Sequence, residues 1–337
     1  MGLRSRLWRE GRLVQQDLAL DELAAHLATE GELVWLDLCL AGKQQLALLD
    51  QVADVLGLDH HAVEDSVAPG ERPKTSRHPN HTFLTVYVTE LLDRGQGQGL
   101  RHDSLLRTSR VSAFVLPRGL VTVRRDEHFA MDRVVERWEQ DAELLTAGVG
   151  ALLHGLLDVV VDGHFETIQR LDDAIEELED VLFAEVPQPR LVQQDSYRLR
   201  KELVELRRVV LPMREVVSGL MRSTERHSER QGALQGYYED LYDHVLRAGE
   251  WTESLRDMIT TVFETNLSLQ DARLNTVMKK LAGWAAVIAV PTAITGWYGQ
   301  NLPYPGFSTP FGLHQSVVLI LVATVGLYLF LRRKDWI

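Results

Sequence analysis

The stretch LAGWAAVIAVPTAITGWYGQNLPYPGFSTPFGLHQSVVLILVATVGLYLFL, Leu281–Leu331, decides the fold of this chain. It contains no Asp, Glu, Lys or Arg in 51 consecutive residues. Its two apolar runs, residues 281–298 and 312–331, hold 18 and 20 residues. An α-helix needs about 20 residues to cross the hydrocarbon core of a bilayer. The sequence therefore predicts two transmembrane helices joined by a proline-rich outer loop at residues 299–311.

Basic residues flank this hairpin at both ends. Lys279 and Lys280 precede the first run, and a basic tail, residues 332–337, follows the second. Because Lys and Arg are retained on the cytoplasmic side, both ends should lie in the cytoplasm. The first residues, MGLRSRLWREGRL, lack the apolar core of a signal peptide. We therefore expect a multi-pass protein of the inner (plasma) membrane with cytoplasmic N- and C-termini.

The composition of the first 280 residues excludes several classes of function. They carry 33 basic and 47 acidic side chains, which argues against nucleic acid as a partner. A single cysteine, Cys39, excludes an internal disulfide and a cysteine-rich zinc site. The sequence also lacks a nucleophile elbow, a Walker loop, an HExxH motif and a glycine-rich dinucleotide turn. We expect no enzyme, no catalytic residues and no cofactor.

The chain ahead of the hairpin divides into two regions. Residues 1–130 mix a helical pattern at residues 43–56 with β-rich runs at 33–38, 82–88, 111–116 and 120–123. Residues 131–280 read as long helices over 131–183, over 191–229 with a kink at Pro212, and from Leu234 into the membrane. The predicted fold class is an α+β membrane protein. It has an N-terminal α/β cytoplasmic domain, a stalk of long helices and a C-terminal two-helix hairpin.

One face of the first membrane helix carries small or polar residues. They recur at spacings of three and four: Asn275, Met278, Ala282, Ala285, Ala289, Thr292 and Gly296. Trp284, Val287, Ile288 and Ile294 are expected to face lipid. Small residues at such spacing can serve close helix packing alone, and that alternative stays open. The outer end, Gly299, Gln300 and Asn301, can aim neutral oxygens along an axis, which suits a hydrated divalent cation such as magnesium. Two helices enclose no pore, so several subunits would have to surround that axis.

Several motifs, in order along the chain, resemble one family. Tyr298-Gly299-Gln300-Asn301 stands where CorA-type magnesium transporters carry Gly-Met-Asn after a Tyr. Further similarities are VEDSVAPGERPK (Val63–Lys74), YYEDLYDHV (Tyr237–Val245), LNTVMKKL (Leu274–Leu281) and the closing RRKDWI. The chain resembles this family over nearly its whole length.

The resemblance implies a homopentameric funnel with a central pore. Gly299, Gln300 and Asn301 would form the mouth, where Asn301 binds the hydrated cation. The pore lining and gate would be Asn275, Met278, Leu281, Ala285, Thr292 and Gly296. Asp240 and, by a looser match, Asp65 would bind a regulatory magnesium ion between neighbouring subunits.

The predicted function is an oligomeric channel for divalent cations, with magnesium, and cobalt as a second ion, taken up through the pore. The expected partners are other copies of the chain, membrane lipid and divalent metal ions. Two departures concern the ion: Gln300 replaces the family's Met, and residues 302–311 contain no carboxylate. The alternatives are a ZntB-like zinc transporter and a membrane-anchored scaffold or sensor that transports nothing.

Overall fold

The computed structural model describes residues 3–40, 43–92, 105–184, 186, 188–224, 232–300 and 303–337. The chain forms two compact units, residues 1–262 and 263–337. One helix, α8 (Gly232–Tyr298), contributes to both. The prediction of a single helix running from about Leu234 to the end of the first apolar run is confirmed.

The first unit is built on a seven-stranded sheet in the order β2-β1-β3-β7-β6-β5-β4. Its strands are β1 (Leu3–Arg9), β2 (Arg12–Gln16), β3 (Glu32–Cys39), β4 (Lys74–Arg77), β5 (Thr82–Leu91), β6 (Leu106–Leu116) and β7 (Gly119–Arg124). Neighbouring strands are antiparallel, except for the parallel pair β3 and β7. The four predicted strands correspond to β3, β5, β6 and β7, whereas β1, β2 and β4 were not predicted.

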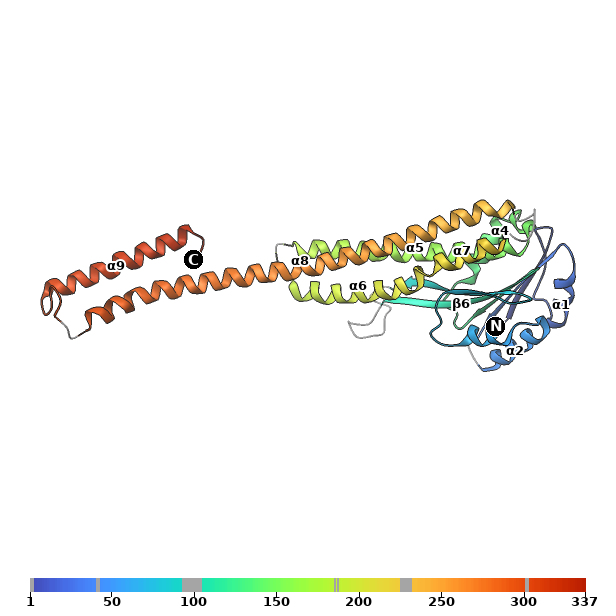
Figure 1. Ribbon diagram of the computed structural model, residues 1–337, viewed down its shortest axis with the longest axis horizontal. Helices are drawn as coiled ribbons and strands as arrows, with labels where there is room; N and C mark the ends of the chain where they lie inside the picture. Colours follow the sequence, from blue (N-terminus) through green and yellow to red (C-terminus); the bar gives the residue numbers. More distant parts are fainter. Residues whose placement is uncertain are drawn as a thin grey trace. The chain divides into compact units, whose positions relative to one another are not determined.

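Helices cover both faces of this sheet (Figure 1). The helices α1 (Leu20–Ala28), α2 (Lys43–Leu56) and α3 (His60–Val67) pack on one face, and α4 (Met131–Gln140) and α5 (Val149–Leu182) pack on the other. The strand β3 is buried along its whole length, and its side chains alternate between the two cores. Leu33 and Trp35 join the α5 side, while Val34 and Leu36 join the α1 side.

A close contact fixes α5 against α4. The indole Nε1 of Trp138 donates to the carbonyl oxygen of Leu152 at 3.0 Å. The ring also stands edge-on to Trp35, with centroids 5.0 Å apart. A Cβ at Gly155 would lie 2.6 Å from that Nε1, so only glycine fits at this position.

Two predicted helices are interrupted. The expected helix over 131–183 breaks into α4, a 3₁₀ turn (Leu144–Ala147) and α5, because Gly148 adopts a φ of 92° that a helix cannot continue through. The helix expected over 191–229 is divided as well. Its first part, α6 (Pro189–Val210), ends before Pro212, and α7 (Met213–Thr224) begins after it. Pro212 has no N–H to donate to the helical hydrogen bonds. The prediction that it only kinks one continuous helix is therefore wrong, because the helix ends there.

A buried ion pair joins the two parallel strands. The guanidinium of Arg124 on β7 donates to both carboxylate oxygens of Asp37 on β3, at 2.6 and 3.1 Å. Thr122 donates to the same carboxylate at 2.7 Å. Burial disfavours the charged guanidinium, but the hydrogen bonds to Asp37 and the attraction of its negative charge together outweigh burial and raise the pKa of Arg124. The charges are buried but fully paired.

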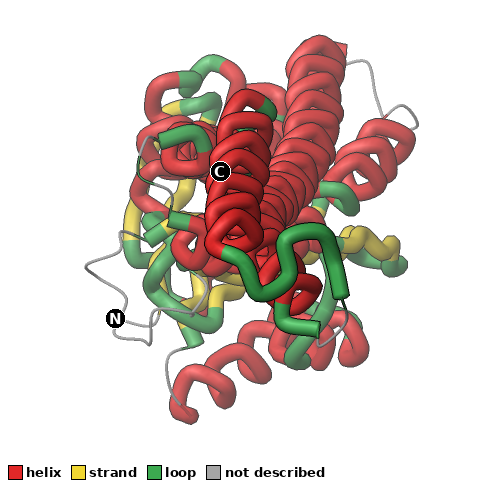
Figure 2. The backbone as a smooth tube through the Cα atoms, turned by 90° about the vertical axis from the view of Figure 1, so that its left-hand side faces the viewer, coloured by secondary structure: helices red, strands yellow, loops and turns green. Residues whose placement is uncertain are grey.

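The second unit is a helical hairpin made by the end of α8 and by α9 (Pro310–Arg333). Figure 2 shows α9 beside the last part of α8, with the connecting loop at the near end. Thr309 caps α9 by accepting a hydrogen bond from the N–H of Gly312 at 3.4 Å. Both helices are long and apolar enough to span a bilayer, as predicted, which fits a membrane protein.

Candidate functional site

The membrane segment of α8 packs on α9 along one seam. The seam residues recur every three or four positions and are buried or half-buried: Gly283, Val287, Val290, Ile294 and Tyr298. The indole of Trp284 lies beside the Tyr328 ring of α9, with centroids 6.2 Å apart. A Cβ at Gly283 would lie 2.9 Å from the Ile337 side chain and 3.1 Å from the Trp336 carbonyl oxygen. Glycine therefore allows the end of the chain to approach α8 closely.

This seam corrects the prediction for Val287 and Ile294. Both were expected to face lipid, but Val287 is only 8% exposed and Ile294 is half-buried. They serve the contact within the hairpin, because residues four and seven positions apart share one helix face. Trp284 and Ile288 are exposed, at 50% and 66%.

The polar stripe lies on a different face of α8. Its member Met278 is 63% exposed, and Leu281, the other residue expected at the gate, is 64% exposed. The remaining members are exposed as well: Asn275, Ala282, Ala285, Ala289, Thr292 and Gly296. Counted at about 100° per residue, the centre of this stripe lies about 150° from the centre of the seam. The second helix of the hairpin thus leaves the stripe uncovered.

The middle of the stripe offers oxygen lone pairs. Thr292 donates its hydroxyl hydrogen to the carbonyl oxygen of Ile288 at 3.2 Å, within its own helix. Such a hydroxyl presents only acceptor lone pairs to its surroundings. Pro291 supplies no N–H to the turn below it. At Gly296 no atom lies within 4 Å of the position that a Cβ would occupy, so the face there is open.

The outer end of α8 closes in a tight turn. The N–H of Gly299 donates to the Thr295 carbonyl at 2.8 Å, and that of Gln300 donates to Trp297 at 3.3 Å. Gln300 is exposed. Asn301, the predicted cation-binding residue of the mouth, lies outside the described residues.

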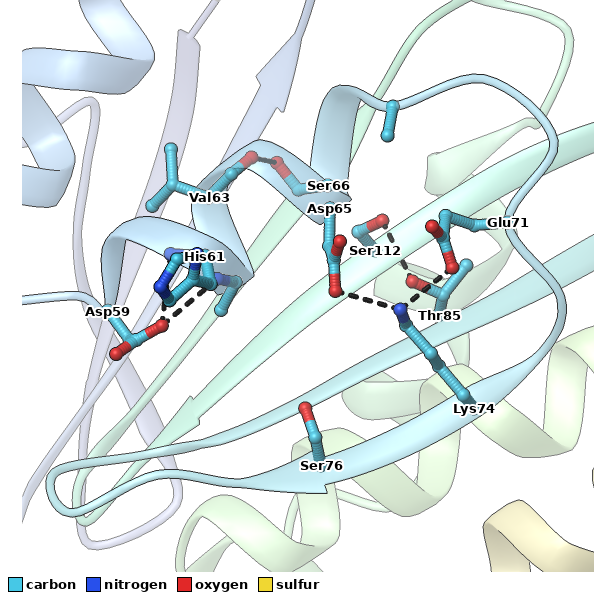
Figure 3. A network of polar contacts seen from close by, with 12 residues as sticks. Asp59, His61, Val63, Asp65, Ser66, Glu71, Lys74, Ser76, Thr85 and Ser112 are labelled. Carbon is cyan, nitrogen blue, oxygen red and sulfur yellow. Dashed lines mark hydrogen bonds and ion pairs between the residues drawn. The ribbon is translucent and has the colours of Figure 1, made fainter.

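The predicted regulatory carboxylate Asp65 is engaged within the first unit (Figure 3). It lies on α3, and its carboxylate pairs with the Lys74 ammonium at 2.8 Å. Glu71 holds the same ammonium at 2.7 Å. Burial opposes the charge on Lys74, yet the hydrogen bonds that its ammonium donates to Asp65 and Glu71, together with their negative charges, outweigh burial and raise the pKa of Lys74. A metal ion at Asp65 would compete with this lysine.

Asp240, the other predicted regulatory residue, is open to solvent. Its side chain is 69% exposed, and its carboxylate lies 3.7 Å from Nδ1 of His244, one turn further along α8. Across the described part of one chain, no group of three His, Cys, Asp or Glu side chains could hold a metal ion. Neither Asp65 nor Asp240 belongs to such a group among the described residues.

The sequence did not reveal a buried polar cluster that lies between α5 and the first turns of α8. His154 on α5 is 6% exposed and lies against the rings of Tyr237 and Tyr238, with centroids 5.5 Å away in both cases. Burial lowers the pKa of His154. One turn along α5, Asp158 pairs with Arg137 of α4 at 2.5 Å. The spacing of His154 and Asp158 was the only signal in the sequence, and ordinary helix faces share it.

Comparisons with known proteins agree with this architecture. The family model described as CorA-like Mg2+ transporter protein matches residues 30–333. The cobalt/magnesium transport protein CorA of Thermotoga maritima is 26% identical over 305 residues, which cover 90% of this chain and 83% of that protein. The zinc transport protein ZntB of Pectobacterium carotovorum is 24% identical over 267 residues, covering 79% and 77%.

The fold is also that of a solved structure. The complete CorA magnesium transporter from Methanocaldococcus jannaschii superposes with a TM-score of 0.74 at 22% identity, covering 100% of this chain and 99% of that one. The family model spans most of the sequence, including the sheet, the long helix and the hairpin. The chain therefore belongs to the CorA-like Mg2+ transporter family, whose members carry divalent cations across membranes and are not enzymes.

Proposed function

We propose that this chain assembles as a homopentamer and takes up magnesium, with cobalt as a second ion, through a pore lined by the membrane segment of α8. One observation carries the proposal: the stripe of small and polar residues is exposed and turned away from α9. Other copies of the chain, arranged around a common axis, would cover that face with protein. Five copies around one axis would each contribute one stripe.

Each part of the stripe has a chemical role in this proposal. Asn275 receives the ion at the inner end, and the exposed side chains of Met278 and Leu281 form an apolar gate. Ala285, Thr292 and Gly296 line the pore with little bulk and with neutral oxygens. Magnesium sheds its water reluctantly, so neutral dipoles can hold the hydrated ion through its outer waters.

Gly299, Gln300 and Asn301 form the mouth in this proposal. The amide oxygen of Asn301 would accept hydrogen bonds from the ion's hydration shell. Basic residues at both ends of the hairpin support cytoplasmic termini in the plasma membrane, with this mouth outside. Lipid then surrounds the outer faces of the helices.

Uptake into proteoliposomes tests the proposal. Magnesium, cobalt, nickel and zinc are compared, with and without a pH gradient, for the wild type and for Asn301→Ala. We expect magnesium uptake by the wild type and its loss in the variant, at unchanged expression and oligomer size. A matched control, Asn80→Ala in the first unit, should transport normally. Normal uptake by Asn301→Ala would reject the assignment of the mouth.

The assembly is tested separately by native mass spectrometry in detergent. A closed pentamer supports the proposal. A monomer or dimer alone would contradict it and would favour a membrane-anchored scaffold or sensor. That alternative also requires that no divalent ion enters the vesicles.

Zinc transport is the second candidate. The similarity to ZntB and the presence of Gln300 in place of the family's Met favour it. Gln300→Met should leave uptake intact if magnesium is the substrate. A switch of preference between zinc and magnesium in this variant would show that Gln300 sets the selectivity.

We also infer that magnesium regulates the channel through Asp240 of one subunit and Asp65 of its neighbour. The exposed carboxylate of Asp240 is available for such a site, whereas Asp65 would have to exchange Lys74 for the ion. Millimolar magnesium should then protect the wild type from proteolysis, and Asp240→Ala should weaken this protection. The site is abandoned if the wild type gains no protection.

A further inference from the structure

The first unit contains a pocket lined by arginine side chains. It has a volume of about 720 Å³ and lies between α6, α8 and the loop that joins α3 to β4. Five arginines contribute to its lining: Arg72, Arg200, Arg207, Arg208 and Arg256. The functional site described above uses none of them.

The local geometry explains how residues far apart in sequence meet here. On α6, positions 200, 204, 207 and 208 fall on one helix face, with Leu211 directly after the helix, and on α8 positions 256, 257 and 260 also share a face. An ion pair between Arg207 and Glu253 ties the two helices together. Figure 1 shows α6 and this part of α8 running alongside each other. Arg72 reaches the pocket from the loop.

Carboxylates satisfy only part of this positive charge. Glu253 also pairs with Arg256 at 3.2 Å, and Asp257 pairs with Arg256 at 3.0 Å. Within the described residues, no carboxylate or other acceptor pairs with the guanidinium groups of Arg72, Arg200 and Arg208. Five arginines therefore face two carboxylates in a chain whose formal net charge is −12.

Like charges held together in a concave site repel each other unless an anion joins them. Guanidinium groups bind phosphate oxygens through paired hydrogen bonds, and several guanidinium groups suit several linked phosphates. The pocket is within the range of about 300–1,000 Å³ that is typical of small-molecule sites. Val204, Leu211 and Pro212 add an apolar wall that could contact a flat ring.

We propose that this pocket binds a small polyphosphate anion, such as a nucleoside di- or triphosphate. The unpaired Arg72, Arg200 and Arg208 hold the phosphates, and Arg207 and Arg256 remain tied to Glu253. None of its residues belongs to the proposed cation pore, because all of them lie in the first unit.

Calorimetric titration of the full-length protein in detergent tests the proposal. The probes are inorganic triphosphate, ATP and AMP, at constant ionic strength and with EDTA so that no metal ion takes part. We expect one triphosphate or ATP per chain, and weaker binding of AMP. Arg200→Gln combined with Arg208→Gln should lower the triphosphate affinity about tenfold or more, because charge-assisted hydrogen bonds are lost.

The matched control removes two positive charges from the same helix outside the pocket, in Arg190→Gln combined with Lys201→Gln. It should leave the affinity unchanged within about twofold, since diffuse surface charge is screened by salt. Three results would overturn the proposal. The first is no binding of triphosphate at millimolar concentration, and the second is equal weakening by both pairs. The third is a combination of two observations: the wild type binds no triphosphate, and the pocket variant dissociates from its oligomer. That combination would mean that carboxylates of a second copy fill the pocket.

Discussion

Replacing His164 with glutamine should remove part of the acid sensitivity of the first unit. His164 lies on α5, is 1% exposed, and its ring Nε2 donates to the carbonyl oxygen of Tyr87 on β5 at 2.8 Å. Burial disfavours the imidazolium more strongly than this backbone hydrogen bond favours it. The pKa of His164 therefore falls from 6.5 to about 4. The folded protein keeps the ring neutral at a pH where an unfolded chain protonates it.

The sign and size of the effect follow from proton linkage. Between pH 6.5 and about 4 the unfolded state binds more protons at this group, so the free energy of unfolding falls as the pH falls. The contribution is fully present above pH 6.5. The whole difference corresponds to about 3 kcal/mol, at about 1.4 kcal/mol per pH unit. By about pH 5, about 2 kcal/mol has been lost.

The assay is thermal unfolding of full-length wild type and His164→Gln at about pH 7.5 and about pH 5. Glutamine keeps an N–H donor near the Tyr87 carbonyl but does not titrate. Relative to the wild type, the variant should gain about 3–4 °C on going to the lower pH, since about 2 kcal/mol is spread over the unfolding entropy of a large unit. The control His128→Gln, at an exposed histidine, should follow the wild type. Parallel pH profiles for wild type and His164→Gln would refute the reasoning.

Three further predictions concern the sheet, the hairpin and the stripe. Asp37→Asn should lower the free energy of unfolding by at least about 3 kcal/mol in chemical denaturation, because Arg124, with its side chain only 8% exposed, would lose its counter-charge. Gly283→Ala should loosen the end of the chain and increase its proteolysis, because the new Cβ would meet the Trp336 carbonyl oxygen at 3.1 Å; the open position Gly296→Ala should show no such change. Thr292→Val should reduce magnesium uptake into proteoliposomes at unchanged oligomer size, and normal uptake would remove Thr292 from the pore lining.

The sequence predicted the strands that are buried in the core, because burial gives them a recognisable pattern of apolar residues. The strands β3, β5, β6 and β7 are buried and rich in β-branched and aromatic residues, so their patterns stand out. The strands β1, β2 and β4 were missed because they are short or carry charged residues. Of these, β2 and β4 are the edge strands, which commonly carry charged residues, and β2 is exposed along its whole length. The break after α4 was missed because residues 141–147 have a helical composition, and only the φ of Gly148 reveals it.

The limits for the candidate site have a similar cause. The period of the stripe was visible in the sequence, because it depends only on helix geometry. The sequence did not show which face of α8 is covered by α9, because Val287 and Ile294 are apolar and equally suited to contact lipid or α9. The arginine pocket was not visible either, because Arg72, Arg200 and Arg256 meet only through the packing of α6, α8 and a loop.

In the proposed assembly the stripe on α8 has two roles, packing against other subunits and conduction of the ion. In one chain alone, α8 contacts only α9 in the membrane, and the stripe is not covered by that contact. The stripe of a single chain would therefore face the hydrocarbon of the bilayer. The acceptor lone pairs of the Thr292 hydroxyl would then lack polar partners, which is costly in lipid. Around a shared axis the same groups meet water and one another. Packing depends on the small size of the stripe residues, whereas conduction depends on their oxygen atoms. Thr292→Val keeps the shape of the side chain and removes its oxygen. The variant should therefore impair conduction and leave packing intact.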